Sequence, residues 1–327
     1  MASTKIDWTH GEGYIGETWN PVTGCTQVSP GCAHCYAKTL AEGRFAHQYP
    51  EGFGKVTLHP ERLAAPLSWR KPRMVFANSM SDLFHEDVPF QFIDRVFAVM
   101  AIAHQHRFQV LTKRPDRMLQ YFCDYGEIGK PTYLRVAEAE LEWPKDLIAT
   151  LRHVLTLDEI ESGDFVGRWP LPNVWLGVSV ENQHWADIRI PLLLQTPAAV
   201  RFVSYEPALK AVDFRHWLLP QVDADPYFCA DCGGFIEPHG GHDCYDAHPA
   251  INQIIVGGES GPKARPFDPA WARQTIAQCR AAGVAVFCKQ MGSVWAREHG
   301  GKGKGGDMAE WPADLRVREY PNGVVER

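Results

Sequence analysis

The sequence lacks several features that would assign it to a membrane, secreted or generally nucleic-acid-binding class. None of its apolar runs approaches the ~18 residues that a membrane-spanning helix needs. Its first residues, Met1-Ala-Ser-Thr-Lys, lack the apolar centre of a secretory signal. The formal net charge is −6, which excludes a global basic field and leaves room only for a local basic groove. These absences predict a cytoplasmic protein with no membrane contact.

Nine cysteines in such a chain indicate metal binding or catalysis before disulfides, because the cytoplasm keeps thiols reduced. Three of them, Cys25, Cys32 and Cys35, are spaced C-x6-C-x2-C on a loop interrupted by glycine and proline. Thiolates this close can converge on one inorganic centre. Three ligands would leave one iron of a 4Fe–4S cluster open. In radical S-adenosylmethionine (SAM) enzymes, the amino and carboxylate groups of SAM occupy that iron.

The spacing of the three cysteines agrees with the radical SAM signature, C-x3-C-x-aromatic-C, at its end but not at its beginning. The last pair reads Cys32-Ala-His-Cys35 and is followed by the ring of Tyr36, whereas the first gap has six residues instead of three. Two alternatives stay open. A structural zinc ion would need His34 or His10 as its fourth ligand, or the thiols could be unligated.

A second set of metal-ligand residues lies in 229–248. Cys229 and Cys232 form a C-x2-C knuckle followed by two glycines, and Cys244 is the third candidate ligand. We take His248 as the fourth, with His239 and His242 as alternatives that spacing alone does not separate. A segment this poor in apolar residues needs a staple to hold a shape, which predicts a structural zinc ion.

Short apolar runs that each end in polar residues recur along the chain. They are 74–78, 108–112, 174–178, 200–203, 254–258 and 284–288, and 18–22 would be a seventh. Most are followed by helical sequence, which is the pattern of a parallel βα barrel with its chemistry at the C-terminal mouth. The predicted fold is therefore α/β, a complete or partial TIM-type barrel of the radical SAM kind with a small metal-binding insertion. A doubly wound sheet is the weaker alternative, because no G-x-G-x-x-G follows the first strand.

This pattern also predicts the domain organisation. The barrel would comprise 1–222 and 250–295, interrupted by a helical insertion at 124–169 and by the Cys/His-rich insertion at 223–249. The remaining 296–327 would form a tail whose glycine-rich run, 300–306, is expected to be mobile. Helices are expected at 36–46, 60–69 and 90–106.

Charged residues gather at the ends of the predicted strands. Carboxylates are costly to bury there without a partner or a task, and lysines would meet anionic groups of a cofactor or substrate. The alternative for each is an ion pair with a neighbour across the barrel mouth. The catalytic candidates are Asp82, Lys113 and Glu206. The candidates for binding SAM are Tyr36, Ser79, Ser179, Glu181, Ser204, Gly257, Gly258, Glu259 and Lys289.

Two further functions compete with the radical SAM hypothesis. Glu206 and Glu259 at strand ends are also typical of the acid and nucleophile of barrel glycosidases, but that hypothesis leaves Cys25, Cys32 and Cys35 unexplained. The other is a non-catalytic module in which both metals are structural and the protein binds a nucleic acid or another protein.

The sequence resembles a family of phage- and mobile-element-associated proteins that contain a domain of unknown function. The resemblance runs over nearly the whole chain and rests on eight segments. They are Thr18-Trp-Asn-Pro-Val-Thr-Gly-Cys, Gly31-Cys-Ala-His-Cys-Tyr-Ala, Ser79-Met-Ser-Asp-Leu-Phe-His, Leu111-Thr-Lys-Arg-Pro, Asn173-Val-Trp-Leu-Gly-Val-Ser-Val-Glu, Arg201-Phe-Val-Ser-Tyr-Glu-Pro, Val256-Gly-Gly-Glu-Ser-Gly-Pro and Phe287-Cys-Lys-Gln-Met-Gly. It implies a radical-SAM-like barrel and, more loosely, a likeness to the lyases that repair spore photoproducts in DNA.

The resemblance therefore favours DNA or RNA as the substrate, to be modified or repaired. The expected zinc knuckle and the basic pair Lys113-Arg114 point the same way, while the net charge of −6 points against it. A radical SAM enzyme would also need an electron donor as a partner.

Overall fold

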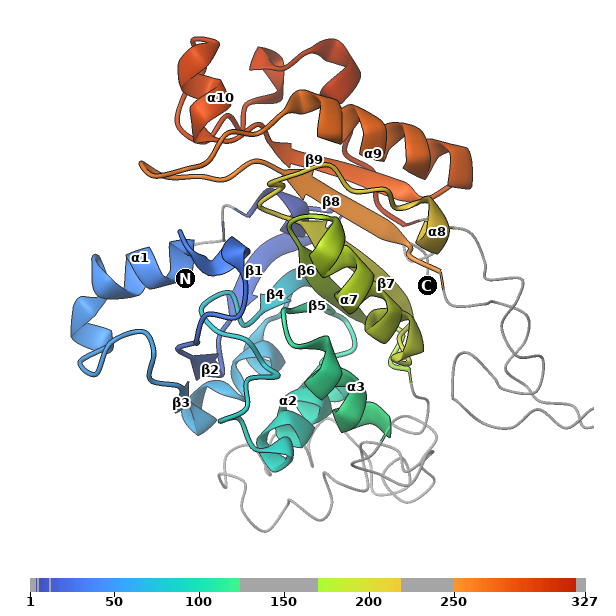
Figure 1. The fold of residues 1–327 in the computed structure, drawn as a ribbon. Helices are drawn as coiled ribbons and strands as arrows, with labels where there is room; N and C mark the ends of the chain where they lie inside the picture. Colours follow the sequence, from blue (N-terminus) through green and yellow to red (C-terminus); the bar gives the residue numbers. More distant parts are fainter. Residues whose placement is uncertain (1–3, 5, 12, 124–169, 219–249, 322–327) are drawn as a thin grey trace, which may run out of the picture.

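The computed structural model describes residues 4, 6–11, 13–123, 170–218 and 250–321 (Figure 1). The expected helical insertion at 124–169 and the expected zinc ligands Cys229, Cys232, Cys244 and His248 lie outside these residues. No helix in the described part of the chain is long and apolar enough to cross a bilayer.

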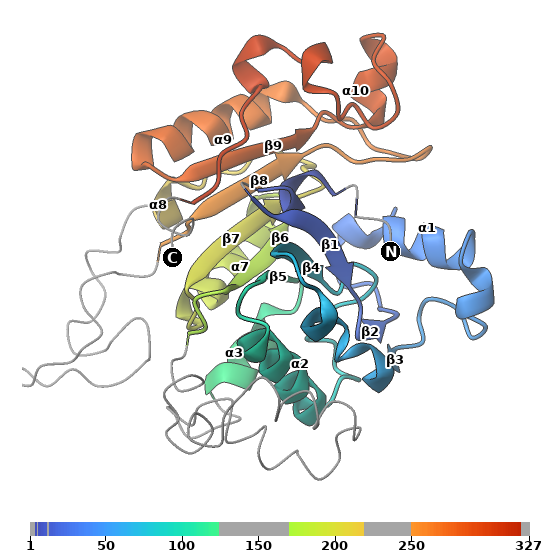
Figure 2. The same ribbon diagram turned by 180° about the vertical axis from the view of Figure 1, so that it is seen from behind.

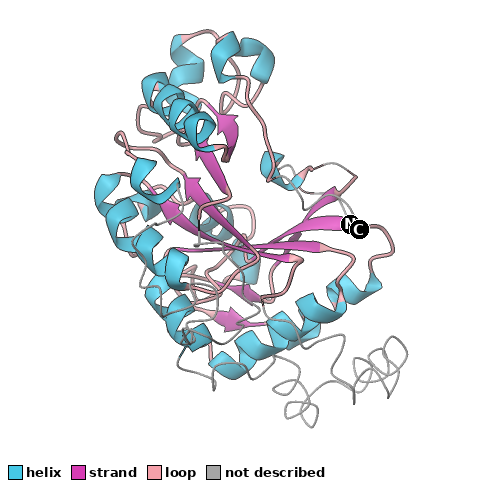
Figure 3. Cartoon of the chain, turned by 90° about the vertical axis from the view of Figure 1, so that its right-hand side faces the viewer, coloured by secondary structure: helices cyan, strands magenta, loops and turns pink. Residues whose placement is uncertain are grey.

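Seven parallel strands form one curled sheet, a half-barrel, so the fold is a partial parallel βα barrel (Figure 3). The strands follow one another in the sheet in the same order as in the chain. They are β1 (Ile15–Trp19), β4 (Arg73–Ala77), β5 (Arg107–Thr112), β6 (Val174–Val180), β7 (Val200–Tyr205), β8 (Gln253–Gly257) and β9 (Ala285–Gln290).

The first strand lies at 15–19 rather than at the expected 18–22. Pro21 has no N–H to donate to a ladder, so the parallel strand ends before it. The next two residues form β2 (Val22–Thr23), which pairs antiparallel with β3 (Thr57–Leu58). Between the first strand and the loop of the three cysteines, the chain therefore passes through a turn and then through β2, which pairs with the distant β3.

Helices cover the outer face of the sheet (Figures 1 and 2). They are α2 (Phe90–Ile102), α3 (Pro115–Cys123), α7 (Gln183–Gln195), α8 (Arg215–Leu218) and α9 (Pro269–Ala282); the short α1 (Tyr36–Glu42) and α10 (Ser293–Glu298) follow β-strand ends. α1 and α2 are shorter than predicted. The expected helix at 60–69 is two 3₁₀ turns, Pro60–Arg62 and Ala65–Ser68, because Pro66 cannot supply a helical N–H.

The alternation of side chains along each strand decides which residues face the barrel interior. Val75, Val110, Leu176, Val203 and Ile254 belong to the outer core beneath the helices. Residues at alternate positions on the strands form the inner core together with Trp8 of the N-terminal turn; the strand members are Met74, Phe76, Trp175, Val200, Phe202, Ile255 and Phe287. The same alternation directs Ser179, Ser204 and Lys289 inward near the C-terminal ends of their strands, and Glu206 just after the end of β7.

The N-terminal segment closes the open side of the half-barrel. The 3₁₀ turn Asp7–Thr9 contacts β1 and β4 and also β9, at the opposite edge of the sheet. The Trp8 ring centroid lies 4.7 Å from that of Phe76 and 5.9 Å from that of Phe202. This turn therefore fills the gap that a complete barrel would close with further strands.

The described part of the expected tail packs against the barrel instead of leaving it. The backbone N–H of Cys288 donates to the carbonyl of Val317 at 2.8 Å, and Phe287 forms an antiparallel bridge with Arg318. Trp311 and Leu315 are fully buried in the outer core. These residues cover the outer edge of β9, which would otherwise present unpaired backbone groups.

Candidate functional site

Two adjoining cavities open at the C-terminal ends of the strands. The larger, here called the main cavity, has a volume of about 340 Å³, and the smaller, the cysteine cavity, has a volume of about 130 Å³. Cys35, Tyr36, Lys113 and Ser179 line both. This is the end of a parallel βα barrel at which active sites are found.

All three cysteines of the C-x6-C-x2-C motif line the cysteine cavity, each as a free, half-buried thiol. A single 3₁₀ turn, Pro30–Cys32, and the bond from the Cys35 N–H to the Cys32 carbonyl bring the last two cysteines together. Cys25 joins them because Gly24 adopts φ +88°, and a Cβ there would lie 2.0 Å from the Lys55 carbonyl oxygen. The sequence spacing and the fold thus agree on one sulfur-lined cavity.

The thiol of Cys25 lies beside a guanidinium. The Sγ atom is 3.5 Å from Nη1 of Arg114, which also donates to Asp82 at 3.3 Å. Burial, together with the charge of Asp82, raises the pKa of Cys25 to about 11 although Arg114 opposes the shift. The thiol is therefore protonated at neutral pH unless a metal replaces its proton.

Three soft sulfur donors on one loop, lining one cavity, are a donor set that suits an iron–sulfur cluster. Among the described residues, no three His, Cys, Asp or Glu side chains lie close enough together to hold a single metal ion. His34 and His10 were the expected fourth ligands of a zinc site. His34 instead bonds Glu259, and Nε2 of His10 lies 2.8 Å from the Thr4 carbonyl oxygen.

A fully buried carboxylate, Glu181, anchors the cysteine loop to β6. Its Oε1 accepts hydrogen bonds from the Ser29 hydroxyl and from the Gly31 N–H, the latter at 3.1 Å. Its Oε2 pairs with the buried Arg189 of α7 at 3.0 Å. A Cβ on Gly31 would lie 2.6 Å from Oε1, so only glycine allows this contact. Glu181 lines neither cavity, and its contacts in the structure position the cysteine loop.

A second carboxylate, Glu259 after β8, anchors the same loop from the other side. His34, between Cys32 and Cys35, contacts its Oε2 at 3.1 Å, and Arg265 binds both of its oxygens, at 2.6 and 2.9 Å. Burial alone would raise the pKa of Glu259, but the bonds from Arg265 and His34 hold it below its usual range. An ionised carboxylate is unsuited to the general-acid role that a glycosidase would require.

Asp82, another of the expected site carboxylates, accepts hydrogen bonds from residues that follow β4 and from residues at the end of β5. It accepts from the Thr112 hydroxyl at 2.7 Å and from the backbone N–H groups of Phe84 and Lys113, each at 3.0 Å. With Arg114 as a further partner, its oxygens are occupied by protein groups. These contacts position the residues around Asp82, which also lines the cysteine cavity, and its catalytic role stays a prediction.

Most of the other expected residues line the main cavity. Glu206 pairs there with Lys289 at 2.9 Å, and Gly257 makes room for this carboxylate, since a Cβ would lie 2.5 Å from its Oε1. The ammonium of Lys113 pairs with no carboxylate in the described part of the chain. Ser179, Ser204, Gly258 and Glu259 are further lining residues.

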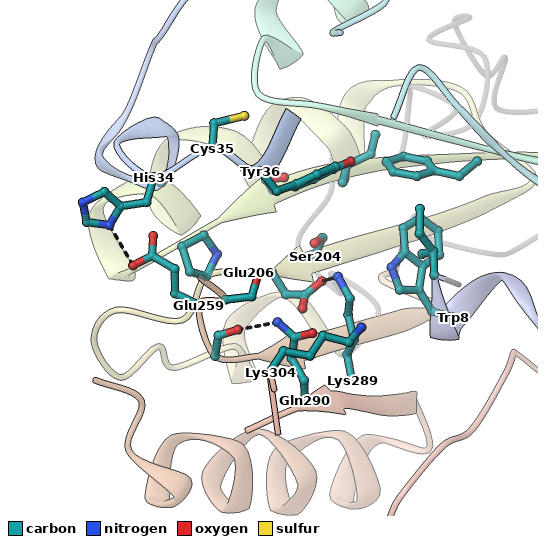
Figure 4. Close-up of a pocket in the computed structure, with 18 of the residues that line it drawn as sticks. Trp8, His34, Cys35, Tyr36, Ser204, Glu206, Glu259, Lys289, Gln290 and Lys304 are labelled. Carbon is teal, nitrogen blue, oxygen red and sulfur yellow. Dashed lines mark hydrogen bonds and ion pairs between the residues drawn. The ribbon is translucent and has the colours of Figure 1, made fainter. Parts of the chain in front are cut away.

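Tyr36 lines both cavities, and Ser79 lines the cysteine cavity. Tyr36 is 48% exposed, and its hydroxyl donates to the Ser79 carbonyl at 2.6 Å, so an accessible aromatic ring is held in place at the cavity mouth. Figure 4 shows His34, Cys35 and Tyr36 along one side of the main cavity and Lys289, Gln290 and Lys304 along the opposite side.

Sequence reasoning missed Asn78. It follows β4 in the left-handed conformation (φ +64°), lines the cysteine cavity and is 2% exposed. Both its Oδ1 and its Nδ2 lack a hydrogen-bond partner in the described residues. An unpartnered amide is costly inside a protein, so Asn78 is placed to bond a ligand of the cavity. The sequence did hold a signal for it: Asn78 continues the alternation of Met74 and Phe76, whose side chains face the barrel interior.

Comparison with known proteins matches residues 3–315 to one family, described as a protein of unknown function (DUF5131). No curated protein and no solved structure matches the chain. The match covers the partial barrel, the three cysteines and both cavities. The chain therefore belongs to the DUF5131 family.

Proposed function

We propose that this protein is an iron–sulfur enzyme of the radical SAM type. The observation that carries the proposal is that three cysteines, and no fourth cysteine of the described chain, line one cavity that adjoins a larger cavity at the barrel mouth. Cys25, Cys32 and Cys35 would hold a 4Fe–4S cluster. When bound, the cluster and SAM would together supply a 5′-deoxyadenosyl radical.

The protein's own residues would prepare the site in three ways. Glu181 and Glu259 fix the loop that carries the thiols, from two sides. Asn78 and Lys113 offer an unpartnered amide and an ammonium to a zwitterionic ligand at the junction of the cavities. Ser179 and Ser204, each 2% exposed, supply hydroxyl groups on the wall of the main cavity at the C-terminal ends of the strands.

The substrate that this arrangement supports best is a phosphate-bearing one, including DNA or RNA. Lys113, Lys289 and Lys304 all line the main cavity of a chain whose net charge is −6. The phage association, the likeness to spore photoproduct lyases, the zinc knuckle at 229–248 and the electron donor stay predictions from the sequence.

Anaerobic reconstitution with iron and sulfide tests the proposal. We expect about four irons and four sulfides per chain, a brown protein, and release of 5′-deoxyadenosine from SAM under reductant. The C25S/C32S/C35S variant should lose the iron and this product. A colourless protein that contains zinc at these cysteines would instead support the non-catalytic module. An intact cluster that does not cleave SAM would contradict the proposed function.

A further inference from the structure

The glycine-rich segment 300–306, after α10, contributes Lys304 to the lining of the main cavity. Gly303 and Gly305 adopt left-handed conformations, with φ of +59° and +62°. The carbonyl of Lys304 accepts from the Gly292 N–H at 3.0 Å, and that of Gly305 accepts from the Met291 N–H at 2.9 Å. These bonds fix the segment to the residues that follow β9. Lys304 therefore stands at a defined position in the cavity wall.

Lys304 is held by a carboxylate from the other end of the chain. Its Nζ lies 2.9 Å from Oδ2 of Asp7, in the N-terminal turn that closes the half-barrel. Lys289 is held in the same manner by Glu206. The Lys304 side chain is 39% exposed, so its ammonium is still accessible to a ligand. Two ammonium groups on the same wall, each positioned by one carboxylate, suit a ligand group with more than one negative charge.

We propose that Lys304, together with Lys289, forms a subsite that binds a phosphate ester group of the substrate. A lysine ammonium is a compact point charge that suits phosphate. The ring of Tyr36, exposed at the mouth and fixed by its hydroxyl, supplies a surface on which a base can stack. The ligand class is thus a nucleotide, either free or as one unit of a single strand. The inference rests on the proposed function in one respect: the bound nucleotide would be the substrate of that reaction. Binding of the phosphate at the subsite does not itself require the cluster.

Binding measurements on the full-length protein test the subsite. AMP and adenosine would be titrated by calorimetry, and a labelled short single-stranded oligonucleotide by fluorescence anisotropy over a range of salt concentrations. We expect AMP to bind at least about ten-fold more tightly than adenosine, since adenosine lacks the phosphate. If only the oligonucleotide binds, the phosphate ester comes from a strand. If AMP binds as well, the subsite accepts free nucleotides. Both results support the subsite.

Three variants separate a binding role of Lys304 from a structural one. K304Q should weaken binding of the phosphate ligand about ten-fold and reduce the salt dependence by about one phosphate contact. K302Q is the matched control, because Lys302 lies in the same segment, is exposed and does not line the cavity. D7N removes the same ion pair, together with the Asp7–Arg318 pair at 3.6 Å, but the backbone bonds to Met291 and Gly292 still hold Lys304 in place. Its ammonium then has no competing carboxylate among the described residues, so D7N should strengthen binding.

Opposite effects of K304Q and D7N would therefore support the subsite. The same loss in both variants, or equal losses in K304Q and K302Q, would overturn it, as would equal and measurable affinities for AMP and adenosine. The proposed function fails separately. Phosphate binding without a cluster or SAM cleavage would refute that function and leave the subsite, whereas SAM cleavage without phosphate binding would refute only the subsite.

Discussion

The buried pair Glu181–Arg189 offers the sharpest test of how the cysteine loop is held. The exposed fractions of the two side chains are 0% and 1%, and Nε and Nη2 of Arg189 have no hydrogen-bond partner in the described residues. Burial also lowers the pKa of Arg189, and the negative charge of Glu181 only partly offsets this lowering. The buried positive charge of the guanidinium is thus compensated by the carboxylate of Glu181. Replacing Glu181 by methionine should cost about 3–5 kcal/mol, since it leaves a buried charge without its partner.

The double variant E181M/R189M should be more stable than E181M alone. Removing both charges eliminates the uncompensated ion, and apolar replacement of a buried pair is often close to neutral. The Gly31 N–H and the Ser29 hydroxyl still lose their acceptor, a loss of about 1–3 kcal/mol. At about 2 °C per kcal/mol for a chain of this size, we expect the melting temperature to fall by about 8–16 °C in E181M, in which both losses add, and by about 2–6 °C in the double variant.

Thermal melts and thiol alkylation would measure the two effects separately. The melts report the uncompensated charge, while the alkylation rates of Cys32 and Cys35 in the native protein, followed by peptide mass spectrometry, report the freedom of the loop. Both variants should be alkylated faster than the wild type, because both lack the acceptor for Gly31. Equal melting temperatures for the single and double variants would refute the charge argument. Unchanged alkylation rates would refute the anchoring role.

Three further predictions concern single residues of the site. G31A should lower the melting temperature and speed alkylation of the cysteines, because its Cβ would lie 2.6 Å from Glu181 Oε1; an unchanged protein would show that the loop has room to shift. The stabilisation contributed by ionised Glu259, whose pKa is lowered by Arg265, is present above the unfolded-state pKa of about 4.3 and lost as pH falls below it. The melting-temperature difference between wild type and E259Q should therefore shrink from pH 7 towards pH 3, and a constant difference would contradict the lowered pKa. For Asn78, N78G should be about 1 kcal/mol more stable than N78A in urea unfolding, since alanine disfavours φ +64°; the reverse order would mean that the backbone relaxes.

The strand pattern was predictable because it is a local property. Runs such as 108–112 and 174–178 lie within β5 and β6, and a buried parallel strand requires a nearly continuous apolar sequence. The ends of elements were less predictable. Pro21 displaced the first strand to 15–19, and two 3₁₀ turns replaced the helix expected at 60–69, because single prolines outweighed the apolar pattern.

The partners of the charged residues could not be predicted from spacing. Glu181 bonds Ser29 across 152 positions of the chain, and Glu259 bonds His34 across 225. Sequence reasoning placed Asp82, Glu181 and Glu259 near a cofactor and gave an ion pair as the alternative for each. The structure favours that alternative, because each of these carboxylates is engaged by protein donors.

The sequence by itself determined the parallel βα architecture and placed Cys25, Cys32 and Cys35 on one short loop, since strand periodicity and a glycine- and proline-bearing loop act over a few residues. Only the tertiary structure decided which polar side chains stay available to a ligand. Asn78, Lys113 and Lys304 face the cavities, whereas the carboxylates nearest the cysteines are held by arginines. Whether a polar side chain is available or already bonded depends on which loop contacts which strand end. Those segments are far apart in the sequence, and only the folding of the half-barrel brings them together.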